Sequence, residues 1–200
     1  ISNDFYERDY LYLNNQDGTF TEDIKNWVSH LSLSAMGVDM ADINNDGNID
    51  IFITDMLPEA DERVKSVMEF ENYNVFKLKQ SKDFYQQYIQ NTLQLNNGNG
   101  TFSEIAYFSG IAKTDWSWAG LIFDMDNDGD LDVLTGNGLD DPETTDDDWA
   151  GKQAMKLYVN YGREEGYVFQ DEARKHGIDS TKENRGTMTF DFDHDGDLDV

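Results

Sequence analysis

The sequence predicts an all-β protein built from β-propeller blades, with a helical insertion between two strands. Three observations support this prediction. An aspartate-rich segment of nine residues occurs three times, at 42–50, 124–132 and 191–199. A strand–turn–strand signature precedes each copy, and short apolar runs flank each copy on both sides. Each repeat therefore carries about four short strands, which is typical of a propeller blade.

The strand–turn–strand signature predicts a β-hairpin. It reads LYLNNQDGTFTE at 11–22 and LQLNNGNGTFSE at 93–104, and a looser copy reads LYVNYGREEGYVFQDE at 157–172. Apolar and polar residues alternate, and Asn, Asp and Gly then supply a turn that tolerates positive φ. The looser copy predicts a different turn. The leading leucine lies 31, 31 and 34 residues before the next acidic segment, which indicates a repeat.

Short apolar strands are expected on both sides of each acidic segment. The preceding runs are GVDMA, AGLIF and GTMTF, and each begins with a small residue: Gly37, Ala119 and Gly186. The runs IDIFITDM and LDVLTGN follow the first two segments. Each acidic segment is therefore expected to connect two neighbouring strands.

Each acidic segment places oxygen-bearing side chains on alternate positions of a tight turn. A hard cation such as calcium takes six to eight oxygen ligands, so this spacing predicts about three calcium sites. Position six is always glycine, where the turn requires positive φ, and position seven is expected to bind through its backbone carbonyl. The predicted ligands are Asp42, Asn44, Asp46, Asn48 and Asp50 in the first segment, Asp124, Asp126, Asp128, Asp130 and Asp132 in the second, and Asp191, Asp193, Asp195, Asp197 and Asp199 in the third.

An EF-hand is the main alternative for such a loop. It requires a bidentate glutamate at position twelve and a following helix. Position twelve is Ile53 in the first segment and Thr135 in the second, and both sequences continue as strands. The EF-hand is therefore excluded.

Composition limits the partners further. The formal net charge is −26, so nucleic acid and anionic membrane surfaces would be repelled, and calcium is the expected counterpart. No apolar run approaches the roughly 20 residues of a membrane helix, so no direct membrane insertion is expected. The hydrophobic content of 38% is sufficient for a core, and the absence of cysteine excludes disulfides.

Two insertions lengthen the repeats. Residues 57–90 are predicted to be a helical insertion, with Pro58 at the first helical position and Val64, Val67 and Met68 on one helical face. Residues 137–154 are predicted to be an acidic loop insertion.

The D-x-D/N-x-D-G-x-x-D segments and the preceding LNNGNGTFSE resemble the FG-GAP/VCBS repeats of integrin-α-type β-propellers. TDMLPE at 54–59 and the stretch at 92–120 resemble bacterial relatives of cartilage acidic protein, many of which carry a C-terminal ASPIC/UnbV domain. The resemblance implies a seven-bladed propeller with calcium in its loops, of which residues 1–200 form a partial domain of three to four blades. It also implies export, to the periplasm, the cell surface or the extracellular space.

The expected function is that of a binding or adhesion module with structural calcium and a protein or glycan ligand. No nucleophile, phosphate-loop or dinucleotide motif is present, so no catalytic or cofactor-binding residue is predicted and the chain is not expected to be an enzyme. The alternative is a polysaccharide lyase or glycoside hydrolase on a propeller scaffold, with Asp115, Asp147 and Asp148 as candidate acids. A third alternative is a structural blade array in a larger surface protein.

Overall fold

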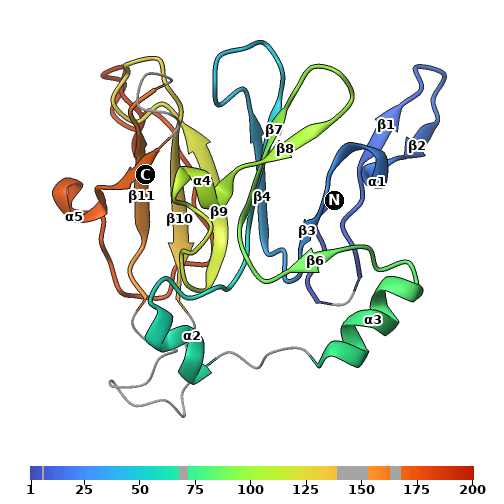
Figure 1. The fold of residues 1–200 in the computed structure, drawn as a ribbon. Helices are drawn as coiled ribbons and strands as arrows, with labels where there is room; N and C mark the ends of the chain where they lie inside the picture. The colour runs from blue at the N-terminus through green and yellow to red at the C-terminus, as the bar shows by residue number, and fades with distance from the viewer. Residues whose placement is uncertain (6, 68–71, 139–152, 163–167) are drawn as a thin grey trace.

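The computed structural model describes residues 1–5, 7–67, 72–138, 153–162 and 168–200. Its centre consists of two four-stranded antiparallel sheets that stand side by side (Figure 1). The strands of the first sheet, in spatial order, are β4 (Gly37–Ala41), β5 (Asp50–Thr54), β7 (Thr92–Asn96) and β8 (Phe102–Glu104). Those of the second are β9 (Ser117–Phe123), β10 (Asp132–Asn137), β11 (Lys156–Asn160) and β12 (Phe169–Asp171). Both sheets confirm the predicted four-stranded, propeller-like blades.

A two-stranded hairpin precedes the first blade. It consists of β1 (Tyr12–Asn14) and β2 (Phe20–Glu22), with Leu13 opposite Thr21. Strands β7 and β8 pair in the same way, as do β11 and β12, so all three predicted hairpins are confirmed. After α1 (Ile24–Trp27), the short β3 (Leu31–Ser32) pairs in parallel with β6 (Gln87–Tyr88).

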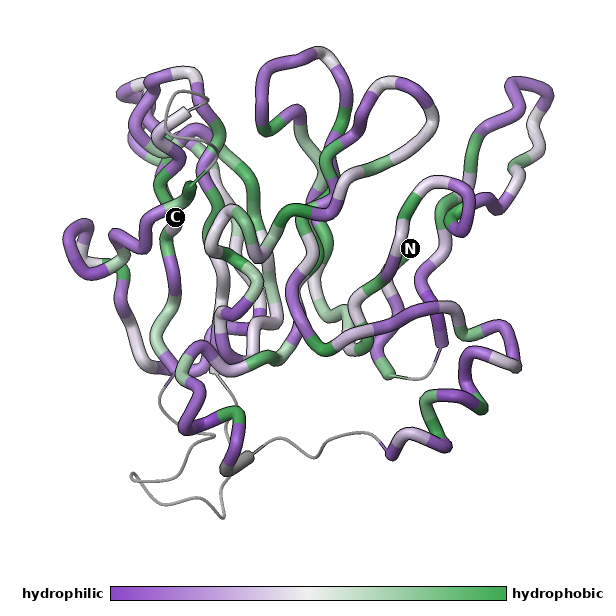
Figure 2. The backbone as a smooth tube through the Cα atoms, in the orientation of Figure 1, coloured by the Kyte–Doolittle hydropathy of each residue, from purple (hydrophilic) through white to green (hydrophobic). Residues whose placement is uncertain are grey.

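The acidic segments connect neighbouring strands, as predicted. Ala41 pairs with Asp50 across β4 and β5, and Phe123 pairs with Asp132 across β9 and β10. In the third repeat, the backbone groups of Phe190 and Asp199 form an isolated bridge around the segment. The first two connections lie at the same edge of the molecule as the β7–β8 turn (Figure 1). These loops are largely hydrophilic (Figure 2).

The first insertion is helical, but its helix begins later than predicted. Between β5 and β7 the chain forms α2 (Asp61–Val67) and α3 (Tyr73–Ser81), at the edge opposite the acidic loops (Figure 1). The prediction that α2 begins at Pro58 is wrong, because the backbone carbonyl of Leu57 accepts the N–H of Asp115 at 3.1 Å and Leu57 is buried. Most of the second insertion, residues 139–152, lies outside the described residues.

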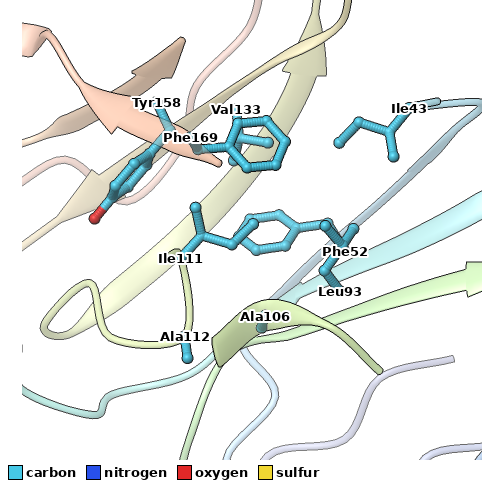
Figure 3. Packing of buried hydrophobic residues seen from close by; sticks show 9 residues of the cluster. All are labelled: Ile43, Phe52, Leu93, Ala106, Ile111, Ala112, Val133, Tyr158 and Phe169. Carbon is cyan, nitrogen blue, oxygen red and sulfur yellow. The ribbon is translucent and has the colours of Figure 1, made fainter. Parts of the chain in front are cut away.

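The largest hydrophobic cluster joins the two blades. Phe52 and Leu93 of the first blade lie near Val133 and Phe169 of the second, and Ile111 lies between them (Figure 3). Phe52, Leu93 and Val133 have no exposed surface. Burial of each such side chain contributes about 1.5–3 kcal/mol to the stability of the folded state. The blades are therefore held together mainly by shared apolar contacts.

Two one-turn helices pack against the third strand of each blade, α4 against β7 and α5 against β11. Helix α4 (Ala106–Ser109) follows β8 and α5 (Ala173–His176) follows β12. Ala106 and Ala173 are both buried. None of the helices among the described residues has the length and apolar character needed to cross a lipid bilayer.

The small residue that begins β4 allows the inner strands of the two blades to approach closely. A Cβ atom at Gly37 would lie 2.9 Å from the backbone oxygen of Trp118 and 3.0 Å from the backbone nitrogen of Gly120. Real Cβ atoms essentially never show contacts below 3.0 Å to backbone. The glycine at the start of this strand is therefore required by the contact between β4 and β9.

Gly37→Ala is expected to lower the free energy of unfolding by about 1–3 kcal/mol, because the added methyl group forces the two blades apart. Gly186→Ala is the matched control, since Gly186 begins the equivalent run of the third repeat and a Cβ there meets nothing within 4 Å. Urea denaturation of both variants tests this. Equal stability of the two variants would contradict the proposed close approach.

Candidate metal centre

The three acidic loops fold alike around the first aspartate of each segment. One oxygen of Asp42 accepts the backbone N–H of the residue at position five at 2.9 Å, and the other accepts the N–H of the position-six glycine at 2.8 Å. The corresponding distances are 3.1 and 3.0 Å at Asp124, and 3.1 and 3.2 Å at Asp191. The repeated sequence therefore produces one repeated loop geometry.

Two residues with positive φ bend each loop. The glycine at position six has φ of 89°, 93° and 99° in the three loops, which confirms the predicted conformation. A Cβ at these glycines would meet nothing within 4 Å, so the backbone angle, not crowding, selects glycine. Position four also has positive φ, at Asn45 (55°), Asn127 (58°) and His194 (63°). This bend directs the side chains of positions one, three and five toward a common centre.

Three carboxylates converge in the second and third loops. One oxygen from each of Asp124, Asp126 and Asp128 lies within 4.8 Å of the others, and the same holds for a second group, formed by Asp191, Asp193 and Asp195. Partial desolvation and the nearby Asp128 carboxylate raise the pKa of Asp126. Like charges at this separation repel, and a divalent cation would reverse the sign of the interaction. An all-oxygen set of this kind fits a hard cation such as calcium.

The first loop has a different donor set. Its position-three residue is Asn44, whose amide donates to Oδ2 of Asp46 at 3.1 Å. The amide of Asn48 donates to Oδ1 of Asp46 at 2.9 Å. Amide hydrogens thus partly neutralise the carboxylate that a cation would contact. A lower cation affinity is expected here than in the second and third loops.

The carboxylate at position nine connects the first and second acidic loops to the hairpin that follows each of them. Oδ2 of Asp50 accepts the N–H of Ile43 at 3.0 Å, and Oδ1 accepts the N–H of Asn96 at 2.8 Å. Asp50 has no exposed surface. Asn96 is the first asparagine of the LNN turn, so one buried carboxylate joins the acidic loop of one repeat to the hairpin of the next repeat.

The second blade repeats this connection. Asp132 accepts the N–H of Met125 and the N–H of Asn160, both at 2.8 Å. Burial raises the pKa of Asp132 to about 6, and the two N–H groups oppose the shift. In the third loop Asp199 accepts the N–H of Phe192 at 2.8 Å.

Sequence reasoning missed this hairpin-holding role. The nearly constant spacing in the sequence does not report this role, because it joins each hairpin to the acidic segment after it, whereas Asp50 and Asp132 bind the hairpin that follows their own loop. Direct contact of the position-nine carboxylates with an ion stays a prediction.

Position four connects the first and second acidic loops to the acidic loop of the next repeat. The Asn45 amide donates to the backbone oxygen of Gly129 at 3.0 Å and to Oδ1 of Asp130 at 3.3 Å. The Asn127 amide donates in the same way to Oδ1 of Asp197 at 2.5 Å. The side chains at position seven therefore face the preceding loop. Binding of an ion by the position-seven backbone carbonyls stays a prediction.

The candidate catalytic acids lie elsewhere. Asp115 is 9% exposed and lies 3.0 Å from Nη1 of Arg63. Burial raises its pKa, and the guanidinium of Arg63 opposes the shift. The ion pair gives this carboxylate a structural partner. Asp147 and Asp148 lie outside the described residues.

Four-stranded blades with an acidic loop between their two inner strands define a repeat protein of the propeller type. The model of the FG-GAP-like repeat family matches residues 1–53 and 84–135, more than half of the chain. The chain belongs to this family. The unmatched residues between the two segments contain α2 and α3, which supports their assignment as an insertion. No curated protein is similar enough to the chain to be called a relative.

Asp132→Asn is expected to lower the free energy of unfolding by about 1–3 kcal/mol in the presence of a chelator, because an amide cannot accept both backbone N–H groups. Asp126→Asn is the matched control, because the Asp126 side chain is exposed and its replacement leaves both N–H groups paired with Asp132. Thermal and urea unfolding without calcium separate this role from metal binding. Equal stability of the two variants would exclude a hairpin-holding role for Asp132.

Asn45→Asp is expected to destabilise the chain by about 1 kcal/mol, because a carboxylate replaces a donor and faces the backbone oxygen of Gly129 and the carboxylate of Asp130. His194→Asp is the control. It adds the same charge at position four of the third loop, where His194 makes no hydrogen bond to any described residue. Denaturation at low salt compares the two variants, and an equal loss would show that the link between the loops contributes nothing.

Proposed function

We propose that the chain is a calcium-binding propeller module in which about three calcium ions stabilise the acidic loops. The observation that carries the proposal is the convergence of three carboxylates in each of the second and third loops. A bound ion would join positions one, three and five of a loop that already holds the hairpin and contacts the next blade. Calcium would therefore stabilise the blades and would have no catalytic role.

The same chemistry supports an exported location. Calcium-binding modules of extracellular proteins bind with dissociation constants of about 10⁻⁴–10⁻³ M, and these concentrations are available outside the cytosol. Exposed carboxylates held by short loops are expected to bind calcium with dissociation constants in this range. We accordingly propose the periplasm, the cell surface or the extracellular space as the place of action.

We further propose that the module binds or adheres to a protein or glycan and does not catalyse a reaction. The likeness to integrin-α-type propellers and to bacterial relatives of cartilage acidic protein supports this, because it rests on the acidic loops and hairpins described above. The ion pair of Asp115 with Arg63 also supports it, since a carboxylate held in this way is not free to act as a general acid.

Calcium is expected to raise the melting temperature of the chain, and a chelator should lower it again. An ion that binds only the folded state contributes about 2.7 kcal/mol per site at one hundred times its dissociation constant. Asp128→Asn should remove most of the contribution of the second loop, and isothermal titration should then detect one ion fewer. Asp171→Asn is a control carboxylate in β12, outside the loops, and should retain the full calcium effect.

An unchanged melting temperature in millimolar calcium, together with no heat of binding, would contradict the proposal. Equal stabilisation by magnesium would contradict a site selective for calcium, because magnesium requires a smaller and more rigid octahedral set.

A further inference from the structure

A cavity lies between the outer parts of the two blades, away from the acidic loops. Its volume is ≈ 450 Å³, within the range of small-molecule sites. Tyr107 of α4 contributes from the first blade, and Tyr158 of β11 and Asp171 of β12 contribute from the second. Glu59 from the segment before α2 and Lys113 from the segment before β9 complete the polar lining.

The hydroxyl group of Tyr158 lacks a protein partner. The side chain is only 4% exposed, and the hydroxyl makes no hydrogen bond to any described residue. Its ring packs in the cluster that joins the blades, while the hydroxyl points away from the other side chains of that cluster (Figure 3). Burial raises the pKa of this hydroxyl, so it stays protonated and able to donate. The hydroxyl oxygen itself is reached by solvent through the cavity, so it can donate to a molecule that binds there.

The charges around the cavity are already paired. Nζ of Lys156 lies 2.7 Å from Oε2 of Glu59 and 2.9 Å from Oδ2 of Asp171. Nζ of Lys113 lies 3.1 Å from Oδ1 of Asp61. An anionic ligand would meet the carboxylates of Glu59 and Asp171, and a cationic ligand would meet the ammonium group of Lys113. The lining therefore favours a neutral polar ligand.

We propose that this cavity binds a sugar unit of a neutral carbohydrate. A sugar hydroxyl group both donates and accepts hydrogen bonds. It can therefore accept from Tyr158 and Lys113 and donate to the carboxylates of Glu59 and Asp171. Tyr107 is 56% exposed and offers an aromatic face at the edge of the cavity, against which the C–H groups of a sugar ring can pack. The site deepens the proposed binding function by naming the ligand class and its location, and it shares no residue with the acidic loops.

The test measures binding of methyl β-D-glucopyranoside and of methyl β-D-galactopyranoside to the whole chain. Saturation-transfer NMR at millimolar sugar detects the binding. Tyr158→Phe removes one hydroxyl without changing the ring and is expected to weaken binding about fivefold, the equivalent of one neutral hydrogen bond. Tyr161→Phe is the matched control, because its hydroxyl donates to Glu172 at 2.6 Å outside the cavity. Tyr107→Ala, at an exposed position, should weaken binding by a similar factor without loss of the fold.

Binding of a neutral glycoside that is weakened in Tyr158→Phe and Tyr107→Ala, but not in Tyr161→Phe, supports the site. Absence of binding, binding that Tyr158→Phe leaves unchanged, or a preference for the charged methyl glucuronide would overturn it. Each titration is repeated with calcium and with a chelator. Sugar binding without a calcium effect on the melting temperature would contradict the calcium proposal alone, and the reverse result would contradict only the sugar site.

Discussion

Asp132 is buried between the second acidic loop and strand β11, and each of its carboxylate oxygens accepts one backbone N–H group. Asp50 makes the same two contacts in the first blade. Burial of a carboxylate is costly, and these N–H donors compensate for part of that cost. The position of each hairpin relative to the acidic loop beside it therefore depends on one residue.

The acidic loops illustrate how negative charge can be tolerated at a blade edge. Each first aspartate accepts two N–H groups of its own loop, while the side chains at positions three and five remain exposed in the second loop. Asn45 and Asn127 then join each loop to the next blade by donating to it. Adjacent blades are thus connected twice, by amide–carboxylate hydrogen bonds at the upper edge and by the apolar cluster around Phe52 and Val133 below it.

The two edges of the blades have different chemistry. The acidic loops lie at one edge, whereas α2 and α3 lie at the other (Figure 1). On the insertion side, Glu59, Lys156 and Asp171 form an ion-paired group beside the cavity. Because Glu59 comes from the insertion while Lys156 and Asp171 come from the second blade, this group exists only when the insertion lies against that blade. Metal binding and ligand binding would accordingly use different surfaces of one scaffold.

The sequence by itself determined the elements that depend on local chemistry: the three hairpins, the strands around the acidic loops, the glycines at position six and the presence of helices between β5 and β7. Alternation, turn residues and backbone angle are properties of neighbouring residues, so a single repeat displays them. Only the tertiary structure decided that helix α2 begins at Asp61, that Asp50 holds a hairpin, that Asn45 reaches the next blade and that Tyr158 lines a cavity. These features depend on contacts between residues far apart in the chain, and no local pattern specifies which groups burial leaves paired or unpaired.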